Sequence, residues 1–340
     1  MVFFHHANPF TVNGAQQILF LFVNEFHIGV SIFFVLSGFL IYWRYESSLF
    51  NSSNWFIHYL QNRFARIYPL YFLLTTLTFA ALLFTARLTF NLESSFIYLA
   101  NITLLKGFFN ELKFTGIAQG WSLTVEECFY LCAPFIFLGW NKFRFILPAF
   151  LLFMGALLVL ALRHVDFYGL FSGFHFMMIY TFFGRCFEFF VGVGLAYYLK
   201  NGKDKSIPWP LTYLGLIAIT LIIGLLVLLG ENGNSGLEHP AGVLLNNFIL
   251  PFAIVSFIYG LIKEPTWIQK ILSSTLAEIL GRSSYAFYLI HAGIFFSAIY
   301  HYITQNIFLI FLLLTILAVA LYYFIERPLN KKWKAKLTER

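Results

Sequence analysis

Charge is scarce in this sequence. Only 11% of its 340 residues are Asp, Glu, Lys or Arg, whereas 60% are hydrophobic, and the mean hydropathy is +0.77. A soluble globular domain has about 25% charged and about 45–50% apolar residues. A water-soluble monomer cannot bury so much apolar surface, whereas a bilayer solvates it. The composition therefore excludes a soluble globule and predicts an integral membrane protein.

Cysteine is also scarce, and the familiar motifs of soluble hydrolases are missing. The three cysteines, Cys128, Cys132 and Cys186, lie in apolar runs and have neither metal-ligand spacing nor a disulfide framework, so we expect small buried side chains. The chain has no G-x-S-x-G elbow, no Walker loop and no H-E-x-x-H motif. The sequence therefore predicts neither a metal site nor a bound cofactor.

The net charge of +7 does not indicate nucleic-acid binding. The 22 Lys and Arg residues are scattered among apolar runs and do not form a basic face. We expect the lipid bilayer, and no nucleic acid, as the surrounding partner.

Long apolar runs are what the sequence does contain. A helix needs about 20 residues to cross a hydrocarbon core of about 30 Å. Nine runs approach this length, at 26–43, 67–86, 121–138, 145–162, 178–199, 209–229, 242–262, 283–303 and 306–325. Two weaker segments, 55–66 and 95–109, carry polar residues and are predicted to lie at the interface. We expect an all-α bundle in which residues 1–340 form a single transmembrane domain.

The positive-inside rule gives this bundle an orientation. If 44–66 faces the cytoplasm, helix alternation places most of the Lys and Arg residues on the same side, in the segments 142–144, 200–205, 263–282 and the basic tail 327–340. The C-terminus is then cytoplasmic. The N-terminus falls on the outer side after a short apolar stub, which predicts a tenth, first helix truncated at its N-terminal end.

Ionisable residues inside spans cost about 2.5–3.5 kcal/mol each on insertion scales, which makes them functional candidates. Glu126 and Glu127 are adjacent on a predicted helix. At about 100° per residue the two carboxylates cannot point the same way, so only one can face into the bundle. Alternatively, both lie in water near the outer interface.

Two other spans carry polar residues of their own. Arg185 and Glu188 are three apart and can neutralise each other on one helix face. They form either an ion pair that fixes helix packing or part of a substrate path. His291 lies one turn after Tyr288, and both are either hydrogen-bonded structural groups or supporting groups of a site.

Two polar pairs lie at the ends of helices. A neutral imidazole of His5 or His6 could accept a proton from a hydroxyl near pH 7. Arg63 and Arg66 are three apart, and guanidinium groups suit the phosphates of a donor, although both could instead be positive-inside anchors.

Seven segments together resemble the acyltransferase-3 family of membrane proteins, and they occur in the order typical of that family. They are 2–5 (VFFH), 28–41 (IGVSIFFVLSGFLI), 63–69 (RFARIYP), 121–130 (WSLTVEECFY), 184–189 (GRCFEF), 284–291 (SYAFYLIH) and 325–328 (IERP). The resemblance implies ten helices, a multi-pass protein of the bacterial inner membrane, and acyl-CoA as co-substrate, most commonly acetyl-CoA. It implies a glycan or glycolipid acceptor and therefore polysaccharide modification by O-acetylation.

The same resemblance assigns residues. His5 matches the family's essential histidine, Glu126 its conserved acid, and Arg63 and Arg66 its R-x-x-R pair. We expect the arginines to bind the CoA phosphates while His5, oriented by Glu126, deprotonates the acceptor hydroxyl; an acyl-histidine relay is the alternative route. Two other functions stay open: a transporter or flippase, and a membrane scaffold that has lost catalysis with its first helix.

Overall fold

A computed structural model describes residues 1–48, 55–201, 209–230 and 233–338, with side chains up to residue 333. Parts of the predicted basic segments 200–205 and 327–340 lie outside these ranges. Helices account for the regular structure of the described residues, and a lone antiparallel bridge joins Phe109 to Leu170. The chain divides into two compact units, the first formed by Met1–Ser48, Cys132–Leu160 and Gly173–Ser274, the second by Leu49–Leu131, Ala161–Ser172 and Thr275–Arg340.

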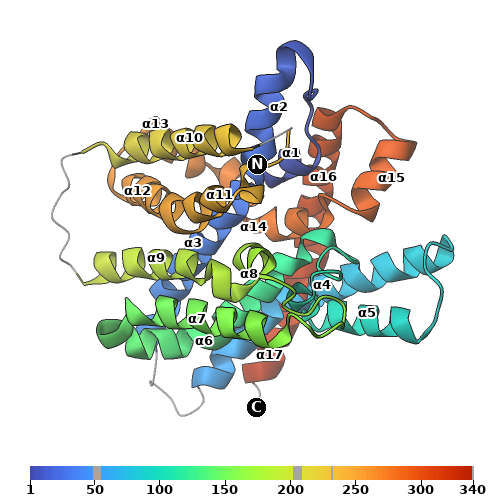
Figure 1. The fold of residues 1–340 in the computed structure, drawn as a ribbon, viewed down its shortest axis with the longest axis horizontal. Coiled ribbons are helices and arrows are strands. Elements are labelled where there is room, and N and C mark those ends of the chain that lie inside the picture. Colours follow the sequence, from blue (N-terminus) through green and yellow to red (C-terminus); the bar gives the residue numbers. More distant parts are fainter. Residues whose placement is uncertain (49–54, 202–208, 231–232, 339–340) are drawn as a thin grey trace. The chain divides into compact units, whose positions relative to one another are not determined.

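The first unit contains the N-terminal helices and the middle of the chain (Figure 1). Its elements are α1 (Val2–His6), η1 (Gly14–Gln16), α2 (Gln17–Asn24), η2 (Glu25–Ile28), α3 (Gly29–Tyr45), η3 (Glu46–Ser48), α8 (Phe174–Tyr180), α9 (Phe182–Lys200), α10 (Leu211–Leu229), η6 (Gly236–Glu238), α11 (Pro240–Leu244), η7 (Leu245–Ile249), α12 (Leu250–Lys263) and α13 (Trp267–Leu272). The C-terminal half of α6 (Trp121–Phe143) and most of α7 (Ile146–Leu162) also belong to it.

The second unit contains the remaining helices. These are α4 (Trp55–Phe84), α5 (Leu92–Ile102), the short η4 (Lys106–Phe108) and η5 (Ala118–Gly120), the N-terminal half of α6, α14 (Thr275–Ile290), α15 (Ile294–Tyr302), α16 (Ile307–Leu321), η8 (Tyr322–Glu326) and α17 (Arg327–Thr338). Within this unit α14 packs against α16, and α17 packs against α4.

Close packing of α3 on α9 organises the first unit, where α10 and α12 also lie side by side (Figure 1). A Cβ atom at Gly38 would lie 2.2 Å from the Phe189 carbonyl oxygen, and one at Gly192 would lie 2.0 Å from the Val35 carbonyl oxygen. Small residues at membrane helix interfaces let two backbones approach closely. This approach brings the polar side chains of α3 and α9 within hydrogen-bond distance.

The all-α, multi-pass membrane fold is confirmed. Within the described part of the chain, seven segments are long and apolar enough to span a bilayer: Gly14–Tyr45, Trp55–Phe84, Ala118–Phe143, Phe174–Lys200, Leu211–Leu229, Pro240–Lys263 and Ile307–Trp333. The predicted span at 145–162 corresponds to α7, which has 17 residues. At 1.5 Å per residue that helix is shorter than the hydrocarbon core.

One predicted span was wrong. The predicted span 283–303 is broken, because α14 ends at Ile290 and α15 begins at Ile294; Gly293 between them has φ of +80°, which a helix cannot contain. The segment 55–66 is continuous with the next span as the single helix α4, and its position at the interface stays a prediction. That helix continues through Pro69, and Ile67 and Leu70 on either side of it are buried.

Candidate functional site

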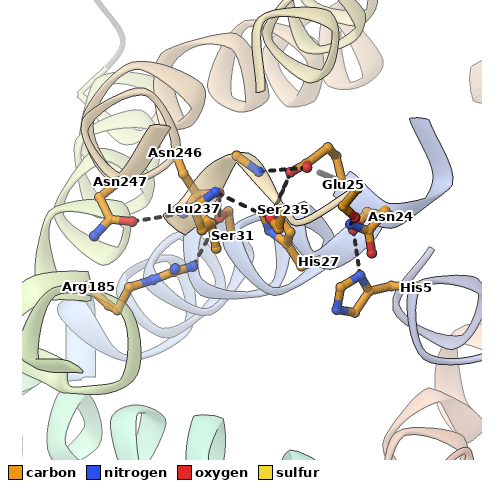
Figure 2. Close-up of polar contacts among 12 residues, drawn as sticks. His5, Asn24, Glu25, His27, Ser31, Arg185, Ser235, Leu237, Asn246 and Asn247 are labelled. Atoms are coloured by element: carbon orange, nitrogen blue, oxygen red, sulfur yellow. Dashed lines mark hydrogen bonds and ion pairs between the residues drawn. The ribbon is translucent and has the colours of Figure 1, made fainter. Parts of the chain in front are cut away.

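His5 lies at the C-terminal end of α1, beside the junction of α2 and η2. Its Nδ1 is 2.6 Å from the backbone carbonyl oxygen of Asn24, the last residue of α2 (Figure 2). Carbonyl groups at a helix end lack the amide partner that the next turn would supply, so this oxygen can accept from a side chain. Because a carbonyl only accepts, Nδ1 carries the proton of the neutral ring. The Nε2 atom is then the unprotonated nitrogen of His5.

The surroundings of His5 favour this neutral form. Burial and the neighbouring His27 lower the pKa of His5 below its ordinary value, while the hydrogen bond to Asn24 and the charge of Glu25 oppose the shift. His5 precedes the candidate span Gly14–Tyr45. A neutral imidazole with its Nε2 lone pair available is the form that a general base requires.

Two residues beside His5 were missed in the sequence. His27 packs edge-to-face on the His5 ring, with centroids 5.7 Å apart, and its Nε2 is 2.8 Å from Oε2 of Glu25. Glu25 is only 1% exposed. The sequence did contain a signal for Glu25, because its carboxyl group lies inside the apolar run 18–36 and a carboxyl group buried there requires polar partners.

Arg185 and Glu188 form the ion pair that their spacing predicts. Arg185 Nε and Nη2 donate to the two carboxyl oxygens of Glu188 at 2.8 and 2.9 Å, and both side chains are buried. Nη2 also donates to Ser31 Oγ on α3 at 3.0 Å (Figure 2).

Two adjacent asparagines extend this network. Ser31 Oγ donates to Asn246 Oδ1 at 3.2 Å, and Asn246 Nδ2 donates to Asn247 Oδ1 at 2.8 Å. Asn247 Nδ2 in turn donates to the carbonyl oxygens of Met178 and Gly184. Both asparagines lie in the π-helical segment η7. The network joins α3, η7 and α9, so the geometry favours the helix-packing role of Arg185 and Glu188 over a substrate path.

Glu126 and Arg63 lie around Tyr130 in the second unit. Glu126 is buried, while Glu127 is half-buried, which agrees with only one of the two carboxylates facing inward. The Tyr130 hydroxyl donates to Glu126 Oε1, and the guanidinium of Arg63 lies 5.7 Å from the centre of the Tyr130 ring. Tyr59 donates to the Tyr130 backbone oxygen at 3.1 Å.

The two members of the R-x-x-R pair have different surroundings. Arg63 is 6% exposed, whereas Arg66 is exposed and acts electrostatically on Glu326. Their spacing suggested two equivalent phosphate ligands. In the structure Arg66 has the accessible guanidinium, and Arg63 is part of the buried cluster around Tyr130.

Tyr288 holds the end of α14 against the start of α6, and His291 is bound to the Tyr288 backbone. The Tyr288 hydroxyl is 2.6 Å from Ser122 Oγ and donates to the Gln119 carbonyl oxygen at 3.0 Å. Gln119 Nε2 donates to the Tyr288 backbone oxygen at 2.6 Å, and His291 Nδ1 is 2.7 Å from the same oxygen. These contacts favour the structural reading of both residues.

Three further sequence predictions concern the contact between His5 and Glu126, the cysteines and a metal site. His5 belongs to the first unit and Glu126 to the second, so the orientation of His5 by Glu126 stays a prediction. Cys186 is buried as expected, but Cys128 and Cys132 on α6 are half-buried. Across the described ranges, no group of three His, Cys, Asp or Glu residues has the arrangement of a metal site.

Comparison with known proteins gives a match over most of the chain. The sequence model of the family Acyl_transf_3, described as "Acyltransferase domain", matches residues 1–327. The O-acetyltransferase OatA of Staphylococcus aureus strain NCTC 8325 / PS 47 is 25% identical over 331 residues, which cover 90% of this chain and 53% of OatA; OatA of strain MRSA252 gives the same figures. The chain thus spans about half the length of the curated relatives it matches. No solved structure matches it.

Proposed function

Since the chain belongs to the acyltransferase-3 family, we propose that it is an integral membrane O-acyltransferase that moves an acyl group from acyl-CoA to a hydroxyl of a cell-surface carbohydrate. Acetyl is the proposed group, because the matched relatives are named O-acetyltransferases. The observation that carries the proposal is the hydrogen bond from His5 Nδ1 to the Asn24 carbonyl oxygen, which leaves Nε2 as the basic atom.

The proposed reaction needs one proton transfer and one substitution at a carbonyl. Nε2 of His5 removes the proton of the acceptor hydroxyl, and the oxygen attacks the thioester carbonyl of acyl-CoA. The new C–O bond forms, the C–S bond breaks, and the CoA thiolate takes the proton back from His5. The products are the ester and CoA-SH. An acyl-histidine intermediate is the alternative sequence of steps.

Arg66, with Arg63 behind it, is proposed to bind the CoA phosphates on the cytoplasmic side. The exposed guanidinium of Arg66 suits a phosphate as a bidentate donor. The inner membrane of a bacterium, with the C-terminus in the cytoplasm, is the proposed location, because most Lys and Arg residues then face inward. The acceptor is proposed to be a glycan or glycolipid modified during export.

The test uses membranes that contain the protein, radiolabelled acetyl-CoA and extracted cell-envelope glycans. Label in a saponifiable product identifies an O-acetyltransferase, whereas a transporter or an inactive scaffold gives none. His5→Ala should lower acetyl transfer by about 10²–10⁴-fold, the usual contribution of a general base. His6→Ala is the matched control, because His6 is the exposed neighbour on the same helix, and it should retain most of the activity. Undiminished transfer by His5→Ala would refute the assignment.

A further inference from the structure

Glu25 is a buried carboxyl group that the proposed transfer does not use. It accepts hydrogen bonds from Ser235 Oγ at 3.0 Å and from the Gly236 backbone N–H at 2.8 Å, and His27 Nε2 lies 2.8 Å away. A carboxyl group is costly to bury unless hydrogen bonds replace its water. These three partners fix its side chain in one position.

His27 transmits this fixed position to His5. Its Nε2 faces the Glu25 carboxyl group, so that nitrogen carries a proton, as in other carboxyl–histidine pairs. Its ring meets the His5 ring at 88°, with the centroids 5.7 Å apart. Figure 2 shows the order of these groups along the chain of contacts, from Ser235 through Glu25 and His27 to His5.

We propose that Glu25 and His27 are positioning residues for His5, a role that rests on the proposed acyl transfer. The Asn24 carbonyl oxygen fixes which nitrogen of His5 is protonated, and the His27 ring fixes the plane of the imidazole. Glu25 holds His27, and the segment between α10 and α11 holds Glu25. The basic Nε2 atom is thereby kept in one direction.

Such positioning has a direct effect on rate. Displacing a reacting group by about 1 Å can cost roughly 10²-fold in rate. A hydrogen bond at Nδ1 alone still permits the His5 ring to turn about the bond to Asn24. The edge-to-face contact with His27 restricts that rotation.

The charges around His5 make the role measurable by pH. Helix α1 packs against α2 and η2; α2 has no titratable side chain, and η2 contributes Glu25 and His27. The groups of α1 itself are His6, with a ring centroid 4.9 Å from that of His5, and the amino group of Met1. His27 lowers the pKa of His5, so its replacement by a neutral side chain raises that pKa.

The experiment compares His27→Gln, Glu25→Gln and the double variant with the unchanged protein in the acetyl-transfer assay. Each single variant should lower kcat by roughly 10–10²-fold and leave the KM for acetyl-CoA unchanged. In His27→Gln the acid limb of the kcat profile should move to higher pH. The double variant should be no slower than the slower single variant, because residues that act as a unit have non-additive effects.

The matched control is Glu238→Gln, which removes an exposed carboxyl group from the same segment and should leave kcat unchanged. Ser235→Ala removes one hydrogen bond to Glu25 without changing a charge and should lower kcat less than Glu25→Gln. If His27→Gln does not insert stably into membranes, the kcat values of Glu25→Gln and Ser235→Ala decide whether the positioning role holds.

The two proposals fail separately. Full transfer by His5→Ala would overturn the function itself. An inactive His5→Ala together with an unchanged kcat and acid limb in His27→Gln, or an unchanged kcat in both Glu25→Gln and Ser235→Ala, would overturn only the positioning role.

Discussion

At the scale of single residues, the state of His5 follows from two contacts and its burial. The Asn24 carbonyl oxygen selects the tautomer, and burial with the neighbouring His27 lowers the pKa of His5. A base with a lowered pKa stays unprotonated over a wider range of pH. Its activity is therefore retained to lower pH than that of an ordinary histidine, whose pKa is about 6.5.

The acid limb of acetyl transfer should accordingly have its midpoint at a lower pH than the pKa of an ordinary histidine, which is about 6.5. Transfer should fall only as the pH drops through the lowered pKa of His5, because protonation then removes the Nε2 lone pair. The measurement is kcat against pH at saturating acetyl-CoA. An acid limb centred above pH 6.5 would contradict the environment found for His5.

Arg63 and Arg66 should behave differently when replaced. Arg66→Ala removes an accessible guanidinium and should raise the KM for acetyl-CoA about tenfold or more with little change in stability, since a hydrogen bond to a charged group contributes about 1.5–3 kcal/mol. Arg63→Ala leaves a hole beside the buried Tyr130 and Glu126 and should also destabilise the protein, by up to about 3–5 kcal/mol.

Donor titrations and thermal unfolding in detergent separate these effects. Arg63→Lys, which keeps the charge, is the control for Arg63→Ala. Equal effects of the two alanine variants on stability would show that the difference in their burial has no energetic consequence.

At the scale of elements, the α3–α9 contact depends on Gly38 and Gly192, which have almost no space around them. A Cβ atom added at Gly192 would collide with the backbone of Val35. One added at Gly194, two residues later on α9, would meet only the Trp140 ring, at 3.7 Å or more. The two positions offer a matched pair, because both glycines lie in the same helix and differ in what a methyl group would meet.

Gly192→Ala should destabilise the protein by about 1–3 kcal/mol, because the helices must separate to accept the methyl group. Gly194→Ala should be neutral or stabilising by up to about 1 kcal/mol, since alanine favours the helix. Thermal unfolding of the two variants in the same detergent is the measurement. Equal stability of the two variants would show that α3 and α9 do not pack as described.

The segment between α5 and α6 is held by a buried lysine. Lys106 Nζ donates to the carbonyl oxygens of Thr115 at 2.7 Å and Ile117 at 2.5 Å. Burial lowers the pKa of Lys106 to about 7. The unfolded chain, with an ordinary lysine pKa of about 10.4, binds more protons between these values, so this group adds stability as the pH rises above about 7.

Lys106→Met should therefore destabilise the protein, by about 1–3 kcal/mol for each carbonyl group left without a partner. The gap in stability between the unchanged protein and the variant should widen from pH 7 to pH 9. Unfolding temperatures at both pH values test this, with Lys142→Met, at an exposed lysine, as the control. A gap that narrows as the pH rises would contradict the lowered pKa.

At the scale of the whole molecule, the seven long apolar segments found among the described residues are those of a multi-pass membrane protein, and the basic residues are placed unevenly along the sequence. The positive-inside rule predicts the direction of the helices from this placement. The segment after α4 and helix α17 should then lie on opposite sides of the membrane.

Single cysteines at two exposed positions test this orientation. In a background with Cys128, Cys132 and Cys186 replaced by alanine, Thr89→Cys should react with an impermeant maleimide in right-side-out vesicles, and Lys331→Cys only in inverted ones. The two variants serve as controls for each other. Labelling of both from the same side would contradict the orientation.

The sequence by itself determined the fold class and most helix positions. A bilayer requires apolar helices of a certain length, and apolar runs of that length are visible in the sequence alone. It also determined the Arg185–Glu188 pair, since a spacing of three fixes neighbours on one helix. These are local properties, and the segment order of the family added His5, Arg63, Arg66 and Glu126 as candidates.

Only the tertiary structure decided what surrounds those candidates. The burial of Arg63 beside Tyr130, the exposure of Arg66, and the contacts of Glu25 with Ser235 and Gly236 join segments that are far apart in the chain. The break at Gly293 and the continuation of α4 through Pro69 were likewise seen only in the folded chain. Hydrogen bonds and burial between distant segments are properties of the folded chain, and they decide which of the polar residues is available for chemistry.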